Sequence, residues 1–85
     1  MNYFVYILEN SSGRHYTGIT TDPKRRLVEH NSGNTKSTNP FRPWEMIYTE
    51  EFPDRQSACK REWYLKHPAG YKEKIEIIRK YGEIG

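Results

Sequence analysis

The stretch His15–Asn31, HYTGITTDPKRRLVEHN, predicts the second strand of a hairpin, a tight connection and the start of a helix. Its first six residues include aromatic and β-branched side chains, which favour a strand. Thr21 or Asp22 can cap a helix, and Pro23 fits the first helical turn because an N–H there would have no partner. The same stretch carries a tyrosine, an arginine and a histidine at intervals that folding alone does not require.

The residues before this stretch predict the partner strand of the hairpin. Tyr3–Leu8, YFVYIL, is almost continuously apolar and rich in aromatic and β-branched residues, which is typical of a buried strand. Asn10–Gly13, NSSG, has the residues of a turn, and residues 14–20 then return as the second strand.

The register of this hairpin decides which side chains share a face of the sheet. If the turn has an odd number of residues, Leu8 pairs with Tyr16, and Tyr6 lies on the same face two residues away. A slip of one residue would send the two tyrosines to opposite faces. We therefore predict a shared face, which the structure can test.

The rest of the chain predicts another strand and three helices. In order, we expect a first helix ending at Gly33, a basic irregular loop over 34–43, a strand over Trp44–Phe52, a helix over 53–67 capped near Asp54 or Ser57, and a helix over 71–82 with Tyr71, Ile75 and Ile78 on one face and Gly82 as its stop. The order ββαβαα predicts an α+β fold, with a small antiparallel sheet flanked by helices.

Length and composition indicate one small domain over residues 1–85 with a mild positive charge. The net charge of +3 suits a polyanionic partner but is common in other proteins. Cys59 is the one cysteine in the sequence, so no internal disulfide can form, which fits a reducing compartment. The apolar run near the N-terminus is too short for a signal peptide or a membrane span, so we expect a soluble cytoplasmic protein.

The first helix presents a pair of basic side chains on one face. Arg26 and His30 are four residues apart and share a face, and Leu27 beside them is expected to point inward. We therefore expect this pair at the rim between core and solvent, although a plain solvated helix face would carry the same pattern. Lys24 and Arg25 point elsewhere and serve either solubility or phosphate contacts.

The second helix places a carboxylate where an apolar side chain is expected. In projection, Glu62 falls within the arc marked by Ala58, Cys59 and Leu65, and a carboxylate facing a core is costly unless it is paired or binds a metal. Either Glu62 forms a buried ion pair with Arg26 or another base, or it projects into a cleft. Lys66 falls in the same arc, but at the helix end it can extend to solvent.

Together these residues supply what phosphodiester hydrolysis requires, although Tyr6 and Tyr16 alone would more often be core aromatics. A base must activate water, and a tyrosine or histidine can do so if its pKa is tuned. A cation must offset charge on the phosphate, and the planar guanidinium of Arg26 suits this. Mg²⁺ is often held by one or two carboxylates plus substrate phosphate, so Glu62 alone could suffice.

The sequence resembles the GIY-YIG nuclease superfamily, in particular its small stand-alone bacterial members. The first family motif matches FVY, Phe4–Tyr6, and the second matches YTG, Tyr16–Gly18. The spaced arginine and the histidine after it fall on Arg26 and His30, and the family's glutamate falls on Glu62 in KREWYLK. The resemblance runs from residue 3 to about residue 66 and includes FRPWEMIYTEEF, which joins the motifs.

This resemblance implies a three-stranded antiparallel sheet flanked by helices, and hydrolysis of DNA or RNA with one divalent metal ion, Mg²⁺ or alternatively Mn²⁺. It implies that Glu62 is the metal ligand and that Arg26 stabilises the phosphate. Tyr16 or Tyr6 would position or deprotonate the attacking water, and His30 would accept a proton or contact the phosphate. Which of these three is the general base stays open.

The sequence departs from the family pattern in three places. Phe4 replaces the first glycine of the family name, and Thr17 replaces the central isoleucine of the second motif. No asparagine follows Asn39, so the further asparagine that some family nucleases carry after the glutamate has no counterpart.

Three function classes follow, in decreasing order of preference. The first is a metal-dependent endonuclease, acting on DNA rather than RNA and serving DNA repair or processing. The second is a non-catalytic nucleic-acid-binding module that keeps the nuclease fold, and the third is a structural or protein-interaction role. The basic loop, with Lys36 and Arg42, can hold a phosphate backbone but shows no base-reading element. A partner protein or a homodimer could supply targeting.

Overall fold

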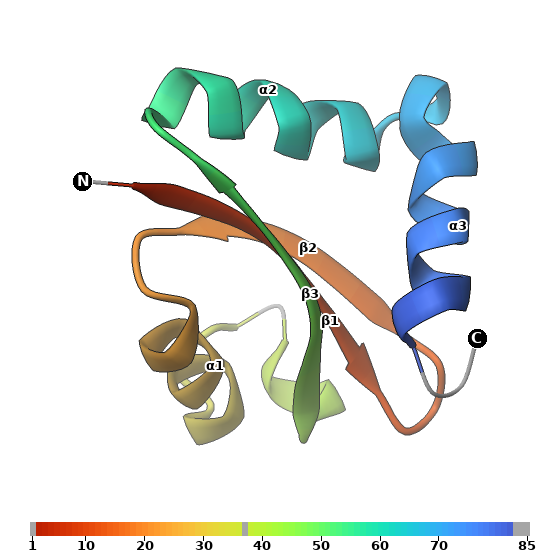
Figure 1. Ribbon diagram of the computed structural model, residues 1–85. Helices are drawn as coiled ribbons and strands as arrows, with labels where there is room; N and C mark the ends of the chain where they lie inside the picture. Colours follow the sequence, from red (N-terminus) through yellow and green to blue (C-terminus); the bar gives the residue numbers. More distant parts are fainter. Residues whose placement is uncertain (1, 37, 83–85) are drawn as a thin grey trace.

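The computed structural model describes residues 2–36 and 38–82, and its elements follow the predicted order (Figure 1). The strands are β1 (Tyr3–Asn10), β2 (His15–Thr20) and β3 (Trp44–Phe52), and the helices are α1 (Pro23–Ser32), α2 (Arg55–Lys66) and α3 (Tyr71–Tyr81). Two short 3₁₀ helices, η1 (Asn39–Phe41) and η2 (Pro68–Gly70), lie in the connections, and sequence reasoning did not predict them. The three-stranded antiparallel sheet flanked by helices is confirmed.

The sheet has the order β2-β1-β3, so β2 is an edge strand, and both pairings are antiparallel. Glu9 pairs with His15, which leaves Asn10–Arg14 between them, an odd number of residues. Leu8 therefore pairs with Tyr16, as predicted, and the register places Tyr6 and Tyr16 on one face. The Asn10 side chain stabilises the turn by accepting hydrogen bonds from the backbone N–H groups of Ser12 and Arg14.

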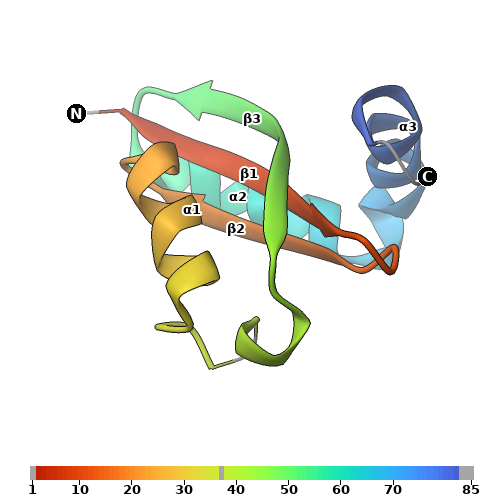
Figure 2. The ribbon, with the colours of Figure 1, turned by 90° about the horizontal axis from the view of Figure 1, so that it is seen from below.

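The two faces of the sheet are covered by different helices (Figure 2). Side chains of β1 alternate between the faces, as the pleat of a strand requires. Val5 and Ile7 pack with residues of α2 and α3, and Tyr6 and Leu8 pack on the side of α1 with Trp44. The continuous apolarity of β1 therefore reflects burial on both faces, and only the α1 side carries the two motif tyrosines.

The caps of α1 and α2 agree with the sequence and choose between its alternatives. Asp22, not Thr21, is the N-cap of α1, and its carboxylate accepts from the backbone N–H of Arg25 at 3.2 Å. Asp54 caps α2 in the same way, accepting from the backbone N–H of Ser57 at 2.7 Å. Gly33 ends α1 with φ at 89°, in the left-handed region that glycine adopts easily.

The predicted apolar face of α3 is wrong in part. Tyr71 is 62% exposed, whereas Ile77 and Ile78 are the buried residues of this helix. The prediction failed because Ile75, Ile77 and Ile78 lie close together in the sequence and can belong to more than one face of a helix. Only the packing of the helix selects which of them are buried. In the part of the chain that the structure describes, no helix has the length and apolarity needed to cross a membrane.

An ion-pair network fixes α2 against its neighbours. The guanidinium of Arg61 on α2 lies 2.9 Å from the carboxylate of Glu50 on β3 and also pairs with Glu73 on α3. One side chain thus ties together a strand and two helices. Because Glu62 follows Arg61 directly, the network also fixes the orientation of the candidate metal ligand.

Candidate active site

Tyr6 and Tyr16 form the base of the candidate site on the α1 face of the hairpin. Their ring centroids are 6.2 Å apart. The Tyr6 ring extends over Gly18 on the neighbouring strand, and a Cβ atom at Gly18 would lie 2.5 Å from the Tyr6 hydroxyl oxygen. The space that Gly18 leaves is thus filled by Tyr6, so Gly18 positions a site residue.

His30 does not lie at the rim, and this corrects the prediction for the first helix. Its side chain is 0% exposed, and its Nε2 atom is 2.8 Å from the Tyr6 hydroxyl. The ring also packs edge-on against Tyr16, with centroids 5.0 Å apart. A fully buried imidazole has no surface for a phosphate, so the alternative of direct phosphate contact is excluded for this conformation. The proton-acceptor alternative stays open.

The hydrogen bonds around His30 favour the tautomer with its proton on Nδ1. Its Nδ1 atom is 2.8 Å from the Thr38 hydroxyl, and that hydroxyl lies 3.3 Å from the carbonyl of Thr35, to which it can donate. With its proton on that carbonyl, Thr38 accepts from Nδ1–H, and Nε2 is left as an acceptor for the Tyr6 O–H. Sequence reasoning missed Thr38, because a threonine in an irregular loop carries no signal of its contact with a distant helix.

The pKa values of this pair favour neutral forms on both sides. Burial raises the pKa of Tyr6 to about 12, and the nearby Arg26 guanidinium opposes that shift. Burial, and then the charge of Arg26, lowers the pKa of His30 below its ordinary value of 6.5. At neutral pH the Tyr6 hydroxyl therefore donates to an uncharged imidazole.

The lowered pKa of His30 predicts that acid destabilises the fold between pH 6.5 and the pKa of the folded state. The unfolded chain binds a proton at His30 near pH 6.5, while the folded chain resists until a lower pH. This contribution to stability is thus complete above pH 6.5 and is lost as pH falls. Urea denaturation of wild type and His30→Gln at several pH values measures it. Equal slopes in the two proteins would contradict the prediction.

Arg26 lies where the sequence predicted, partly exposed beside the two tyrosines. Its guanidinium pairs with Glu29 at 2.9 Å and is close enough to the Tyr6 hydroxyl to lower the pKa of that group. The structure therefore brings Arg26 together with Tyr6, Tyr16 and His30. One edge of the guanidinium is engaged by Glu29, and the partial exposure leaves Arg26 accessible to a ligand.

Glu62 reaches the same cluster from the other face of the sheet. Its carboxylate pairs with Lys66 at 3.2 Å, and the Lys66 ammonium lies 5.8 Å from the centroid of the Tyr16 ring. The charge of Glu62 also raises the pKa of Tyr6, as the smallest of the contributions to that shift. Because β2 is the edge strand, side chains of α2 can reach around it. The ion-pair alternative is therefore met by Lys66 and not by Arg26.

The donor set around Glu62 fits a weakly held divalent cation. Residues 2–36 and 38–82 contain no group of three or more histidine, cysteine or acidic side chains that could form a metal cage. Mg²⁺ commonly needs only one or two carboxylates with waters and substrate phosphates. The Glu62 side chain is 21% exposed, and its partner Lys66 is 44% exposed with a flexible side chain. The carboxylate can therefore release the Lys66 ammonium and bind a divalent metal ion in its place.

The four basic residues proposed for nucleic-acid contact are all exposed: Lys24, Arg25, Lys36 and Arg42. Arg25 also pairs with Glu29 at 3.7 Å, and Arg42 donates to the backbone carbonyls of Asn39 and Asn31. Arg42 thus helps to hold the loop after α1. Contact of these residues with nucleic acid stays a prediction.

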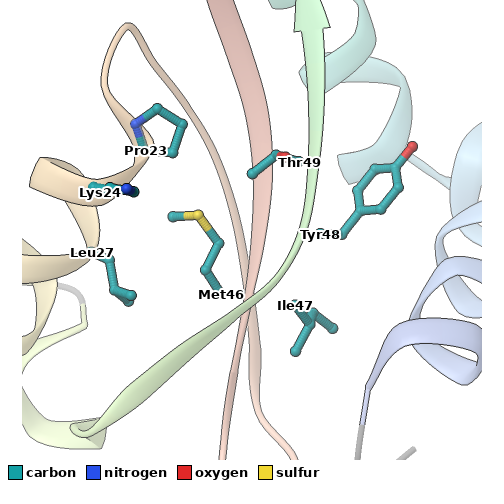
Figure 3. Close-up of a pocket in the computed structure, with 7 residues that line it drawn as sticks. All are labelled: Pro23, Lys24, Leu27, Met46, Ile47, Tyr48 and Thr49. Carbon is teal, nitrogen blue, oxygen red and sulfur yellow. The ribbon is translucent and has the colours of Figure 1, made fainter.

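Two surface hollows near α1 and β2, within residues 2–36 and 38–82, each fail to bring the candidate catalytic residues together. One hollow of about 310 Å³ lies between α1 and β3, where the end of the Met46 side chain points toward the start of α1 at Pro23 and Lys24 (Figure 3). Its lining is mostly apolar and contains neither a carboxylate nor any of the five predicted catalytic residues. A second hollow, of about 280 Å³, is lined by Tyr16 together with Thr38 and Trp44. The site is therefore defined by the polar cluster at the β2 edge.

Two small proteins are similar to this chain over most of its length. The chain is 39% identical to the UPF0213 protein BH0048 of Halalkalibacterium halodurans over 83 residues, covering 96% of this chain and 88% of that protein. It is 42% identical to the UPF0213 protein VNG_2274C of Halobacterium salinarum over 65 residues, covering 75% of this chain and 84% of that protein.

Solved structures and the family profile agree with this similarity. The solution NMR structure of BH0048 aligns with a TM-score of 0.58 at 38% identity, covering 98% of this chain and 89% of that one. The NMR structure of EF2693 from E. faecalis aligns with a TM-score of 0.55 at 35% identity, covering 91% and 88%. The profile of the GIY-YIG catalytic domain matches residues 2–75. The chain therefore belongs to the GIY-YIG family, whose domain is that of a nuclease superfamily.

Proposed function

We propose that this protein is a divalent-metal-dependent endonuclease that hydrolyses phosphodiester bonds, in DNA rather than RNA, with a role in DNA repair or processing. The observation that carries the proposal is one cluster of side chains: the Tyr6 hydroxyl lies against His30 and close to Arg26, and the Glu62–Lys66 pair lies beside Tyr16. A cation, a carboxylate and a linked acceptor of protons within one cluster are what the reaction needs.

Hydrolysis joins a water oxygen to phosphorus and breaks the bond from phosphorus to a sugar oxygen. The proton of the water must therefore be accepted. We assign this role to Tyr6 and His30 together. Tyr6 is 1% exposed in this structure, so the step requires local opening around its hydroxyl. The Tyr6 oxygen then takes the proton of the water while its own proton moves to Nε2 of His30, 2.8 Å away. Thr38 keeps Nε2 free to accept by holding the proton on Nδ1. This pathway avoids free Tyr6 phenolate, whose pKa of about 12 makes it scarce at neutral pH.

The other site residues bind and orient the phosphate. The Arg26 guanidinium offsets the negative charge that grows on the phosphate oxygens. Tyr16, beside Lys66 and against His30, lines the approach to the Tyr6 oxygen and orients the water. Glu62 would hold the divalent ion, Mg²⁺ or Mn²⁺, which when bound would polarise the phosphate and neutralise the leaving oxygen. GIY-YIG nucleases generally use such ions.

The Glu62–Lys66 ion pair favours a second candidate, a non-catalytic module that binds nucleic acid. With Lys66 at 3.2 Å, the Glu62 charge is already compensated without a metal ion. Such a module would bind polyanions through its exposed basic residues, with strong dependence on salt.

A cleavage assay with a panel of labelled substrates tests the two candidates. The panel contains duplex, single-stranded and flapped DNA and an RNA hairpin, each incubated with Mg²⁺, Mn²⁺ or chelator. We expect cleavage of DNA that chelator abolishes, and a larger loss for Tyr6→Phe than for Tyr16→Phe. The non-catalytic module would be favoured if the protein binds nucleic acid with an affinity that falls with salt but cleaves no substrate in either Mg²⁺ or Mn²⁺.

A further inference from the structure

An exposed tryptophan on α2 is not used by the site described so far. The Trp63 side chain is 58% exposed, and its ring stacks on His67 with centroids 3.9 Å apart and planes at 23°. The Nδ1–H of His67 donates to the Trp63 backbone carbonyl at 2.6 Å. One large aromatic ring is thus held in a fixed orientation by its neighbour while more than half of its surface faces solvent.

The position of Trp63 on α2 puts it beside the candidate site. With about 100° per residue, Lys66 projects roughly 40° from Glu62 and roughly 60° from Trp63, so it lies between them on the helix surface. Lys66 is also the side chain that pairs with Glu62 and lies over Tyr16. Around the surface of α2, the Trp63 indole is therefore the next side chain after Lys66, which lies at the edge of the site.

Positive charges flank the indole along the same surface. Lys60 is exposed and precedes Trp63 by three residues, and Lys66 follows it by three, so both lie on its side of the helix. Basic side chains alternating with an exposed aromatic ring are the pattern with which proteins bind single strands, by contact with phosphates and by stacking.

We propose that Trp63 is a stacking platform for an unpaired nucleobase next to the cleaved phosphate, with Lys60 and Lys66 contacting the phosphates on either side. This inference rests on the proposed function and names the substrate class: nucleic acid with a single-stranded segment at the site. Stacking on the indole requires an open base face, and the bases of a duplex already stack on each other. A substrate with an unpaired end or flap therefore binds more tightly than a uniform duplex.

Fluorescence and anisotropy titrations in the presence of chelator test this platform without any cleavage. Trp44, the other tryptophan, is 6% exposed and donates its indole N–H to the Thr38 carbonyl. The quenching that remains in Trp63→Ala measures the share of Trp44, so the difference from wild type reports on Trp63. We expect a single-stranded oligonucleotide to quench the fluorescence and a blunt duplex to quench it much less. Trp63→Ala should weaken single-strand binding by about 5- to 150-fold, the range that loss of one stacked base predicts, and Trp63→Phe should retain most of the affinity.

Tyr71→Ala is the matched control. Tyr71 is 62% exposed on α3, so its replacement by alanine removes a comparable exposed aromatic surface. It should leave single-strand affinity unchanged. The platform would be overturned by any of four results. These are an unquenched indole, equal losses of affinity for Trp63→Ala and Tyr71→Ala, equal weakening of duplex and single-strand binding by Trp63→Ala, and no oligonucleotide binding at all. Failure of the proposed nuclease function is a separate result, since it appears as absent cleavage by metal-loaded wild type.

Discussion

Glu62→Gln is expected to reduce cleavage by about 10³-fold or more, because the amide cannot replace the carboxylate in holding a divalent cation that supplies several kcal/mol of transition-state stabilisation. Binding of nucleic acid in chelator should persist, since the substitution removes a negative charge beside the phosphate. The fold should be intact: Glu62 and Lys66 form a partly exposed i,i+4 pair, and such pairs contribute only about 0.3–0.5 kcal/mol. Single-turnover cleavage at several Mn²⁺ concentrations measures the effect.

Glu76→Gln is the control for this substitution. Glu76 is an exposed acid on α3, so the same change of charge occurs away from the Tyr6–His30 pair. Its cleavage rate should equal that of wild type. Undiminished cleavage by Glu62→Gln would remove Glu62 from the metal site and leave its ion pair with Lys66 as its role.

Arg26→Ala is expected to lower the rate of the chemical step by about 10²- to 10³-fold, the range found when one donor to a developing oxyanion is removed. Arg26 is the guanidinium that lies near the Tyr6 hydroxyl, and no lysine or arginine precedes it on that face of α1. Arg26→Lys should recover only part of the loss, because an ammonium cannot offer the planar pair of donors. Single-turnover rates at saturating substrate separate this effect from weaker binding.

The neighbouring arginine offers a matched control within the same helix. Arg25 also pairs with Glu29, at 3.7 Å, but its side chain is 65% exposed, against 30% for Arg26, and it projects about 100° from Arg26 around the helix. Arg25→Ala should weaken binding modestly, with a smaller dependence on salt, and leave the chemical step unchanged. If the two alanine variants lost the same activity, Arg26 would be one more phosphate contact and not a stabiliser of the transition state.

The sequence could predict the hairpin because its strands and turn are local patterns, but it left the register open. An odd turn length pairs Leu8 with Tyr16 and places Tyr6 on the same face, and the structure shows that the turn has such a length. The caps Asp22 and Asp54 are also local, because a helix N-terminus needs an acceptor within its first turn. The candidate site could be predicted only as a set of residue types at motif spacings, helped by the resemblance to a family.

Contacts between distant segments were beyond prediction. Helix periodicity placed His30 at a rim, and nothing local revealed that the loop carrying Thr38 folds over it and buries it completely. The same periodicity put Glu62 in an apolar arc, but the choice between Arg26 and Lys66 as its partner depended on how α2 packs against the edge strand.

The amino-acid sequence by itself thus determined the order of the elements, the caps of the first two helices and the candidate residues of the site. The tertiary structure decided how those residues act on one another: Tyr6 donates to a buried His30, Gly18 makes room for the Tyr6 ring, and Glu62 reaches the cluster around β2. The physical reason is that register and capping are set by neighbours in the chain, whereas burial, tautomer and pKa are set by groups that only folding brings together.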